Sequence, residues 1–81
     1  MTRVRCLVQA GLVSSEKIVR IKTSEGRQEE VAVSASQVRG SALEAPVIGR
    51  EGGKILIELP RESSSGHWRL WVNKDQLIES A

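Results

Sequence analysis

The chain is 81 residues long, 40% of its residues are hydrophobic, and 12 Lys and Arg residues oppose 10 Asp and Glu residues to leave a formal net charge of +2. This length accommodates a single small domain spanning residues 1–81, because a core needs roughly 50 residues or more to close. With two Trp and neither Phe nor Tyr, the core must be aliphatic, which leaves little material for the aromatic grooves that stack nucleic-acid bases or bind proline-rich peptides.

The first predicted element is a strand over residues 3–10, where apolar and polar side chains alternate except at Leu7, an apolar residue in the outward set. Alternation of this kind is typical of a half-buried strand. Its inward set is Val4, Cys6, Val8 and Ala10. Because Cys6 is the only cysteine, it cannot form an intramolecular disulfide and is most simply a small buried thiol.

A first hairpin is predicted from strands at 17–23 and 27–34, with Gly26 supplying the positive φ of a three-residue turn. Residues that face each other across a hairpin share one face of the sheet. The inward residues of both strands are odd-numbered, so this turn length pairs Val19 with Val31 inside and Arg20 with Glu30 outside.

A short strand follows at 43–48, and its Pro46 suits a sheet edge. The loop 49–53 then leads into a second hairpin, with strands at 54–59 and 67–72 around the loop 60–66. The same parity test allows a register that pairs the inward residues of this hairpin as Leu59 with Trp68, Ile57 with Leu70 and Ile55 with Val72. Neighbouring registers of the same parity stay open, because the long loop 60–66 constrains the register poorly.

The outer face of the second hairpin then carries the pairs Glu58–Arg69 and Leu56–Trp71. The two indoles are thereby predicted on opposite sides of one strand. Trp68 is expected in the core, where replacement by alanine would cost roughly 3–5 kcal/mol. Trp71 is expected on the surface, where its replacement would cost little stability.

Both hairpins end in the same pattern, a Ser or Asn with Gln three residues later, at Ser34–Gln37 and at Asn73–Gln76. This spacing is typical of a capped helical turn, in which side chains satisfy the first free amides. We therefore predict two single helical turns, each following a strand. The offset of 39 residues between the two patterns indicates either an internal duplication or a chance match, and the sequence leaves both open.

Six short strands with regular turns and no helix longer than one turn together predict an all-β fold, either a small barrel or a barrel-like sandwich. The segment 68–78, a strand entering one helical turn and leaving as a short closing strand, resembles the corresponding part of SH3-like barrels. The resemblance implies a small five- to six-stranded SH3-like barrel with one or two single-turn 3-10 helices. Peptide-binding SH3 domains line their groove with Tyr, which this chain lacks, so the resemblance does not imply recognition of PxxP motifs.

The outward triplet His67, Arg69 and Trp71 is the strongest candidate site, with Leu56 and Arg61 as further partner-binding residues. Trp and Arg are the residue types enriched at interface hot spots. The alternative interpretation is structural: Trp71 covers Leu56 while Arg69 pairs with Glu58.

The leading functional prediction is a non-catalytic interaction module, a small cytoplasmic β-barrel that binds a protein partner through an edge strand and the Trp71/Arg69 face. Weak self-association through the strand at 3–10 is a second expectation, since open sheet edges tend to pair. The alternative is a nucleic-acid-binding barrel that uses Arg20, Lys22, Arg61 and Arg69 beside Trp71.

Catalytic, metal and cofactor chemistry are not expected. His67 is the only histidine, Cys6 has no second cysteine to form a zinc pair, and the adjacent Glu29 and Glu30 face opposite sides of their strand. Glu29 is interpreted as a solubility charge. No run approaches the roughly 18 apolar residues of a membrane span, and no cleavage site follows the N-terminal residues, so a cytoplasmic protein without membrane contact is expected.

Overall fold

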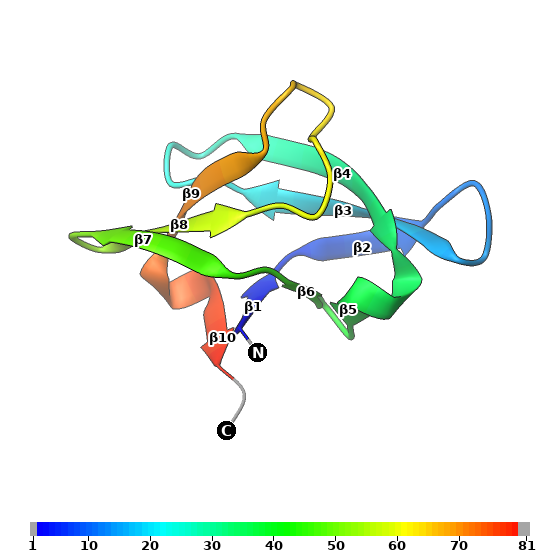
Figure 1. Cartoon of the computed structure of the whole chain (residues 1–81), viewed down its shortest axis with the longest axis horizontal. Helices are drawn as coiled ribbons and strands as arrows, with labels where there is room; N and C mark the ends of the chain where they lie inside the picture. Colours follow the sequence, from blue (N-terminus) through cyan, green and yellow to red (C-terminus); the bar gives the residue numbers. More distant parts are fainter. Residues whose placement is uncertain (1, 80–81) are drawn as a thin grey trace.

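The computed structural model describes residues 2–79 as an all-β domain of three antiparallel sheets, none of them closed into a barrel (Figure 1). The first sheet has the order β10-β1-β6-β5, the second β2-β3-β4 and the third β7-β8-β9. The strands are Thr2–Arg5 (β1), Leu7–Ala10 (β2), Glu16–Lys22 (β3), Gln28–Ser34 (β4), Val38–Arg39 (β5), Ala42–Glu44 (β6), Val47–Glu51 (β7), Lys54–Glu58 (β8), Arg69–Asn73 (β9) and Leu77–Glu79 (β10).

Two predicted strands are each divided between two sheets. The strand expected at 3–10 is interrupted at Cys6, so that β1 pairs with β6 and β10 while β2 pairs with β3. The strand expected at 43–48 is interrupted at Ala45 and Pro46, between β6 and β7. Proline has no N–H to donate to a ladder, and the Pro46 carbonyl instead accepts a hydrogen bond from the Glu58 N–H at 3.1 Å. These interruptions let one chain segment serve two sheets. The all-β class is confirmed, while the five- to six-stranded SH3-like barrel is not, because none of the three sheets is closed.

The registers of both predicted hairpins are confirmed. Val19 lies opposite Val31 and Arg20 opposite Glu30 in the β3–β4 pair, where Gly26 has a φ of 87°. In the β8–β9 pair, the observed partners are Ile55 with Val72, Leu56 with Trp71, Ile57 with Leu70 and Glu58 with Arg69. The loop expected at 49–53 is shorter than predicted, because β7 continues to Glu51 and the chain reverses at Gly52 and Gly53.

The two predicted helical turns are present as 3-10 turns, Ala35–Gln37 (η1) and Lys74–Gln76 (η2). In each, the Gln side chain accepts a hydrogen bond from the backbone N–H of the capping residue, at 3.1 Å for Ser34 and 3.2 Å for Asn73. Over residues 2–79, no helix is long and apolar enough to cross a membrane.

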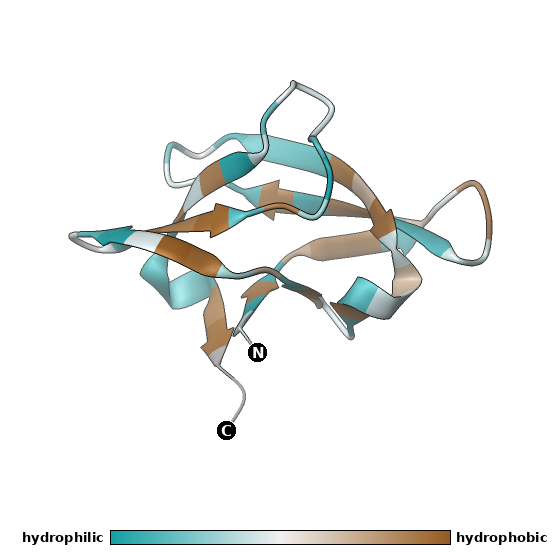
Figure 2. Cartoon of the chain, in the orientation of Figure 1, coloured by the Kyte–Doolittle hydropathy of each residue, from teal (hydrophilic) through white to brown (hydrophobic). Residues whose placement is uncertain are grey.

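The core is aliphatic, as the composition requires. Hydrophobic positions occur along the strands of all three sheets (Figure 2), and the buried ones form one core cluster. The fully buried large side chains are Ile21, Leu43, Ile55, Ile57, Val4, Val19, Val31, Val33 and Val72. Apolar residues also lie outside the core, in the loop between β2 and β3, where Leu12 is 96% and Val13 58% exposed.

The prediction that Trp68 belongs to the core is wrong, because its side chain is 55% exposed. The predicted main-chain pairing does hold, since the Leu59 N–H donates to the Trp68 carbonyl at 2.8 Å. β9, however, begins only at Arg69. Trp68 therefore lies in the bend before the strand, where the alternation of inward and outward side chains no longer applies.

Cys6 is buried at the junction of β1 and β2, as predicted. Burial raises the pKa of its thiol from 9.0 to about 11, so the thiol is protonated and unreactive at neutral pH. We expect iodoacetamide to leave the native chain unmodified at pH 8 and to alkylate it fully in urea, as measured by intact mass. Rapid alkylation of the native chain would contradict the burial of Cys6.

Candidate functional site

Trp71 lies in a row of residues that crosses the third sheet. Leu56 on β8 is paired with Trp71 on one side and with Gly49 of β7 on the other. A Cβ atom added at Gly49 would lie 3.4 Å from the Cβ of Leu56 and 3.9 Å from the Cη2 of Trp71. The half-buried indole therefore extends across Leu56 toward Gly49, where the absent side chain leaves it room.

A cleft of about 200 Å³ lies between β9 and the turn that joins β3 to β4. The Ser24 N–H donates to the Trp71 carbonyl at 2.8 Å, which holds this turn against β9. His67, Arg69 and Trp71 line one side of the cleft, and Thr23, Glu25, Arg27 and Glu29 line the other. Trp71 also lines a second cavity of about 240 Å³ together with Ser24, Glu25, Glu51 and Lys54.

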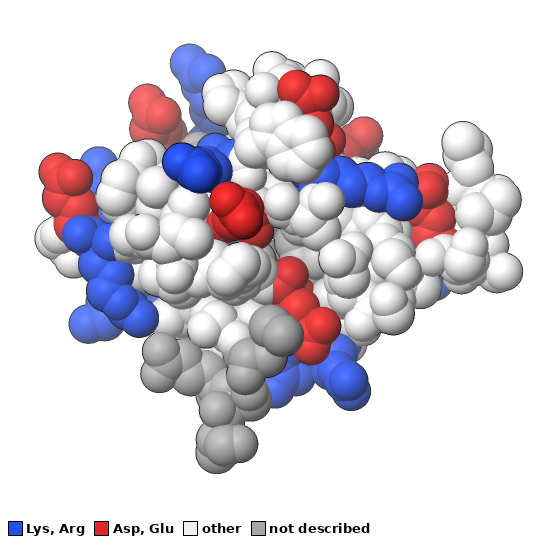
Figure 3. Space-filling model, in the orientation of Figure 1, with Lys and Arg blue, Asp and Glu red and all other residues white. Residues whose placement is uncertain are grey.

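The charges around this cleft are mixed. Arg69 forms an ion pair with Glu58, with 3.6 Å between Nε and Oε2, while Arg27 shares the cleft lining with Glu25 and Glu29. The wider surface has the same character, with acidic and basic side chains interspersed over the face shown in Figure 3. The cleft consequently has no strong field of one sign.

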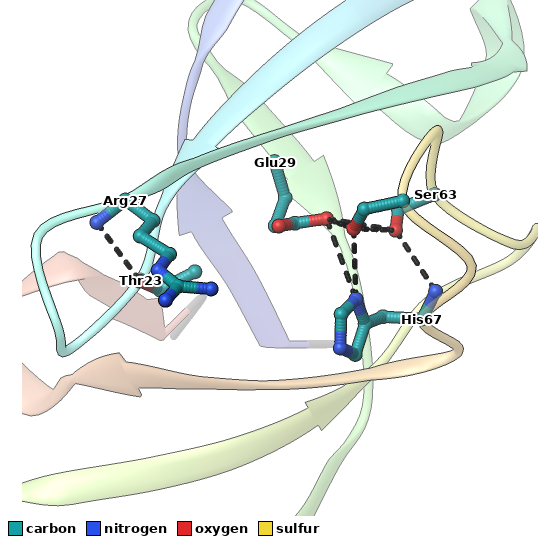
Figure 4. Close-up of polar contacts among 6 residues, drawn as sticks. Thr23, Arg27, Glu29, Ser63 and His67 are labelled. Carbon is teal, nitrogen blue, oxygen red and sulfur yellow. Dashed lines mark hydrogen bonds and ion pairs between the residues drawn. The ribbon is translucent and has the colours of Figure 1, made fainter.

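Glu29 is the centre of a polar cluster beneath the cleft (Figure 4). Its carboxylate accepts hydrogen bonds from the hydroxyls of Ser63, at 2.8 Å, and of Ser65. The Ser65 hydroxyl also lies 2.8 Å from the Nδ1 of His67, and the His67 N–H donates to the Ser63 hydroxyl at 3.0 Å. The cluster thus ties the loop between β8 and β9 to β4.

These hydrogen bonds set the ionisation of Glu29. The hydroxyl of Ser65 lowers the pKa of the Glu29 carboxyl below its ordinary value of 4.5, assisted by Ser63, His67 and Arg27 and opposed by desolvation. Glu29 is only 8% exposed, so its interpretation as a solubility charge is wrong. The sequence did contain one indication that Glu29 is buried. Glu29 is two residues before Val31 and four before Val33 on β4, so its side chain lies on the same inward face.

The combination of Ser65, His67 and Glu29 differs from a catalytic triad in its geometry. In a triad, the serine and the acid bond opposite nitrogens of the imidazole. Here the Ser65 hydroxyl and the Glu29 carboxylate both face Nδ1, at 2.8 Å and 3.7 Å. This arrangement anchors the loop and cannot relay a proton from the serine through the ring to the acid.

The structure brings some predicted site residues together and separates others. His67, Arg69 and Trp71 share the cleft, and Leu56 lies directly beside Trp71. Arg61 lies elsewhere, paired at 3.4 Å with Glu16 of β3. Arg20 and Lys22 line a different groove, so the basic row proposed for nucleic acid is dispersed over three places. Within residues 2–79, no three His, Cys, Asp or Glu side chains are grouped so as to hold a metal ion.

Comparison of the chain with models of protein families, with curated proteins and with solved structures finds no match. The geometry of the cleft is therefore the basis on which its function is inferred.

Proposed function

We propose that this protein is a non-catalytic interaction module that binds a protein partner through the Trp71/Arg69 face. The observation that carries this proposal is the position of the two indoles, the only aromatic side chains of the chain. Trp68 is 55% exposed and Trp71 is half-buried, while the core is aliphatic. Trp71 shares the cleft with Arg69, and Trp and Arg are the residue types enriched at interface hot spots.

The charge pattern favours a protein partner over a nucleic acid. A surface that follows a phosphate backbone needs a concentration of unpaired cations. Around Trp71, the cation Arg69 is already paired with Glu58, and Glu25 and Glu29 line the cleft beside Arg27. Mixed charges of this kind suit the polar rim of a protein interface.

The open edge of β2 is a second part of the proposed interaction surface. β1 is covered on both sides, by β6 and β10, whereas among the described strands β2 pairs with β3 alone. The Gly11 N–H donates to the Glu16 carbonyl at 3.1 Å, so alternation directs the main-chain groups of Val8 and Ala10 away from β3. A partner strand or a second copy of the chain would pair at these groups, beside the exposed Leu12.

Replacing Trp71 with alanine is expected to abolish capture of the partner, because Trp71 lines both the cleft and the adjoining cavity and truncated Trp residues dominate the energy of many interfaces. The measurement is affinity capture from native cell extract, with and without nuclease, followed by mass spectrometry. Trp71→Leu serves as a second variant, since it retains an apolar cover over Leu56 while removing the indole. Lys17→Gln, a change outside the cleft, is the matched control.

Support for the proposal is a reproducible set of proteins captured by the wild type and by Lys17→Gln, lost with both Trp71 variants, and resistant to nuclease. A captured set that both Trp71 variants retain would refute the proposed surface. A set that disappears with nuclease would favour nucleic-acid binding instead.

A further inference from the structure

A separate groove of about 440 Å³ opens on the outer face of β1, β2 and β3. Unlike the cleft and the adjoining cavity, it is not lined by Trp71. The β2–β3 register places Leu7 opposite Arg20 on this face. Lys22 follows Arg20 by two residues on β3 and so points to the same side, and Arg5, at the end of β1, lines the same groove. The Gln76 amide donates to the Lys22 carbonyl at 2.8 Å and fixes η2 as the end wall of the groove.

The groove has an excess of positive charge that the protein does not neutralise. Within residues 2–79, neither Arg5 nor Lys22 has a side-chain hydrogen-bond or ion-pair partner, while Arg20 is paired with Glu30 at 3.1 Å. Asp75 is the one acidic residue among those that line the groove. Because Arg5 and Lys22 line the same groove, their charges add in one concavity and attract an anion to it.

We propose that this groove binds an acidic, extended segment of a partner protein, at a site separate from the Trp71 cleft. The carboxylates of the segment contact Arg5 and Lys22, because guanidinium and ammonium groups form charge-assisted hydrogen bonds with carboxylates. An apolar side chain of the segment packs on Leu7, which is 63% exposed at the rim.

The lining chemistry distinguishes this ligand from a nucleic acid. Single-stranded nucleic acids bind on aromatic platforms on which their bases stack. The described lining of the groove contains no aromatic residue and offers an aliphatic side chain, Leu7, beside its cations. That combination matches a segment that alternates acidic and apolar residues.

The test is a titration of the isotopically labelled chain, followed by NMR, with a short Glu-rich peptide carrying interspersed Leu residues. We expect shift changes centred on Arg5, Leu7 and Lys22. The double variant Arg5→Gln/Lys22→Gln should bind about 10-fold more weakly, the loss expected for two exposed ion pairs. Asp75→Asn should bind more tightly than the wild type, because it removes the opposing charge.

Two control variants distinguish binding in the groove from attraction by the net charge of the protein and from binding in the Trp71 cleft. The variant Lys17→Gln/Arg39→Gln loses the same formal charge outside the groove and should retain wild-type affinity. Trp71→Leu should bind the peptide unchanged, so that this proposal and the proposed function stand or fall separately.

Three results would overturn the proposal: equal binding of the peptide's Gln-for-Glu counterpart, undiminished binding by the Arg5/Lys22 double variant, or tighter binding of oligothymidylate than of the acidic peptide. If the double variant does not give a folded spectrum, Asp75→Asn decides the question. Unchanged or weaker peptide binding by Asp75→Asn would then refute the site.

Discussion

Replacing Ile57 with alanine is expected to lower the free energy of unfolding by about 2–5 kcal/mol. The side chain is fully buried on β8, between its partners Val47 on β7 and Leu70 on β9. Its truncation would leave a cavity in the centre of the third sheet. A small domain has a total stability of about 5–15 kcal/mol, so this variant should unfold at far lower urea concentration, as followed by circular dichroism.

The matched comparison is Trp68→Ala, which removes a larger side chain from a position that is 55% exposed. Its expected cost is about 1 kcal/mol or less, because most of the indole is already in water. Equal destabilisation by the two substitutions would mean that Trp68 is buried in solution.

The register of the first hairpin could be predicted because side-chain parity and turn length constrain each other, whereas in the second hairpin the long loop 60–66 left neighbouring registers open. Val19 and Val31 must lie on the same face of the sheet, and with a three-residue turn ending at Gly26 only one register of the two strands satisfies this condition. That register places Arg20 opposite Glu30. The capped 3-10 turns were predictable for a similar reason, since Ser34 and Gln37 interact within four residues of sequence.

The arrangement of the sheets could not be predicted in this way, because alternation along a strand says nothing about which neighbour each half of it pairs with. The segment 3–10 alternates with the one exception of Leu7, yet β1 and β2 belong to different sheets on either side of Cys6. Trp68 shows the same limit. Trp68 is two residues before the buried Leu70 and would share its inward face in a continuous strand. β9 begins at Arg69, however, so the alternation does not extend to Trp68.

Only the side of the cleft formed by β9 and the residues before it could be predicted from the sequence. His67, Arg69 and Trp71 come from one strand and its flank, so their common face follows from local spacing. Arg27 and Glu29 reach the cleft from another hairpin, and their approach depends on the Ser24–Trp71 hydrogen bond between distant segments. Arg61, in the loop 60–66, was misplaced because no periodicity orients a loop.

Replacing Glu29 with glutamine is expected to destabilise the protein by about 1–3 kcal/mol at neutral pH, the range for buried hydrogen bonds to a charged group. Glu29 accepts from Ser63, which is 5% exposed, and from Ser65. The matched control is Glu30→Gln on the same strand, where the carboxylate is 45% exposed and paired with Arg20. An exposed pair of this kind contributes about 0–1 kcal/mol, so the neighbouring substitution should cost clearly less.

The destabilisation by Glu29→Gln should depend on pH in a defined direction. The pKa of Glu29 is lowered on folding from its ordinary value of 4.5, so its ionised form stabilises the fold fully above about pH 4.5 and that contribution is lost as the pH falls through the folded-state pKa. The free-energy difference between wild type and Glu29→Gln, from urea titrations across this range, should therefore shrink on acidification. The Ser65 hydroxyl is the largest cause of the lowered pKa of Glu29. Ser65→Ala should therefore raise the pH at which half of the stabilisation by ionised Glu29 is lost. A difference independent of pH would show that the Glu29 carboxylate is not held by these serines.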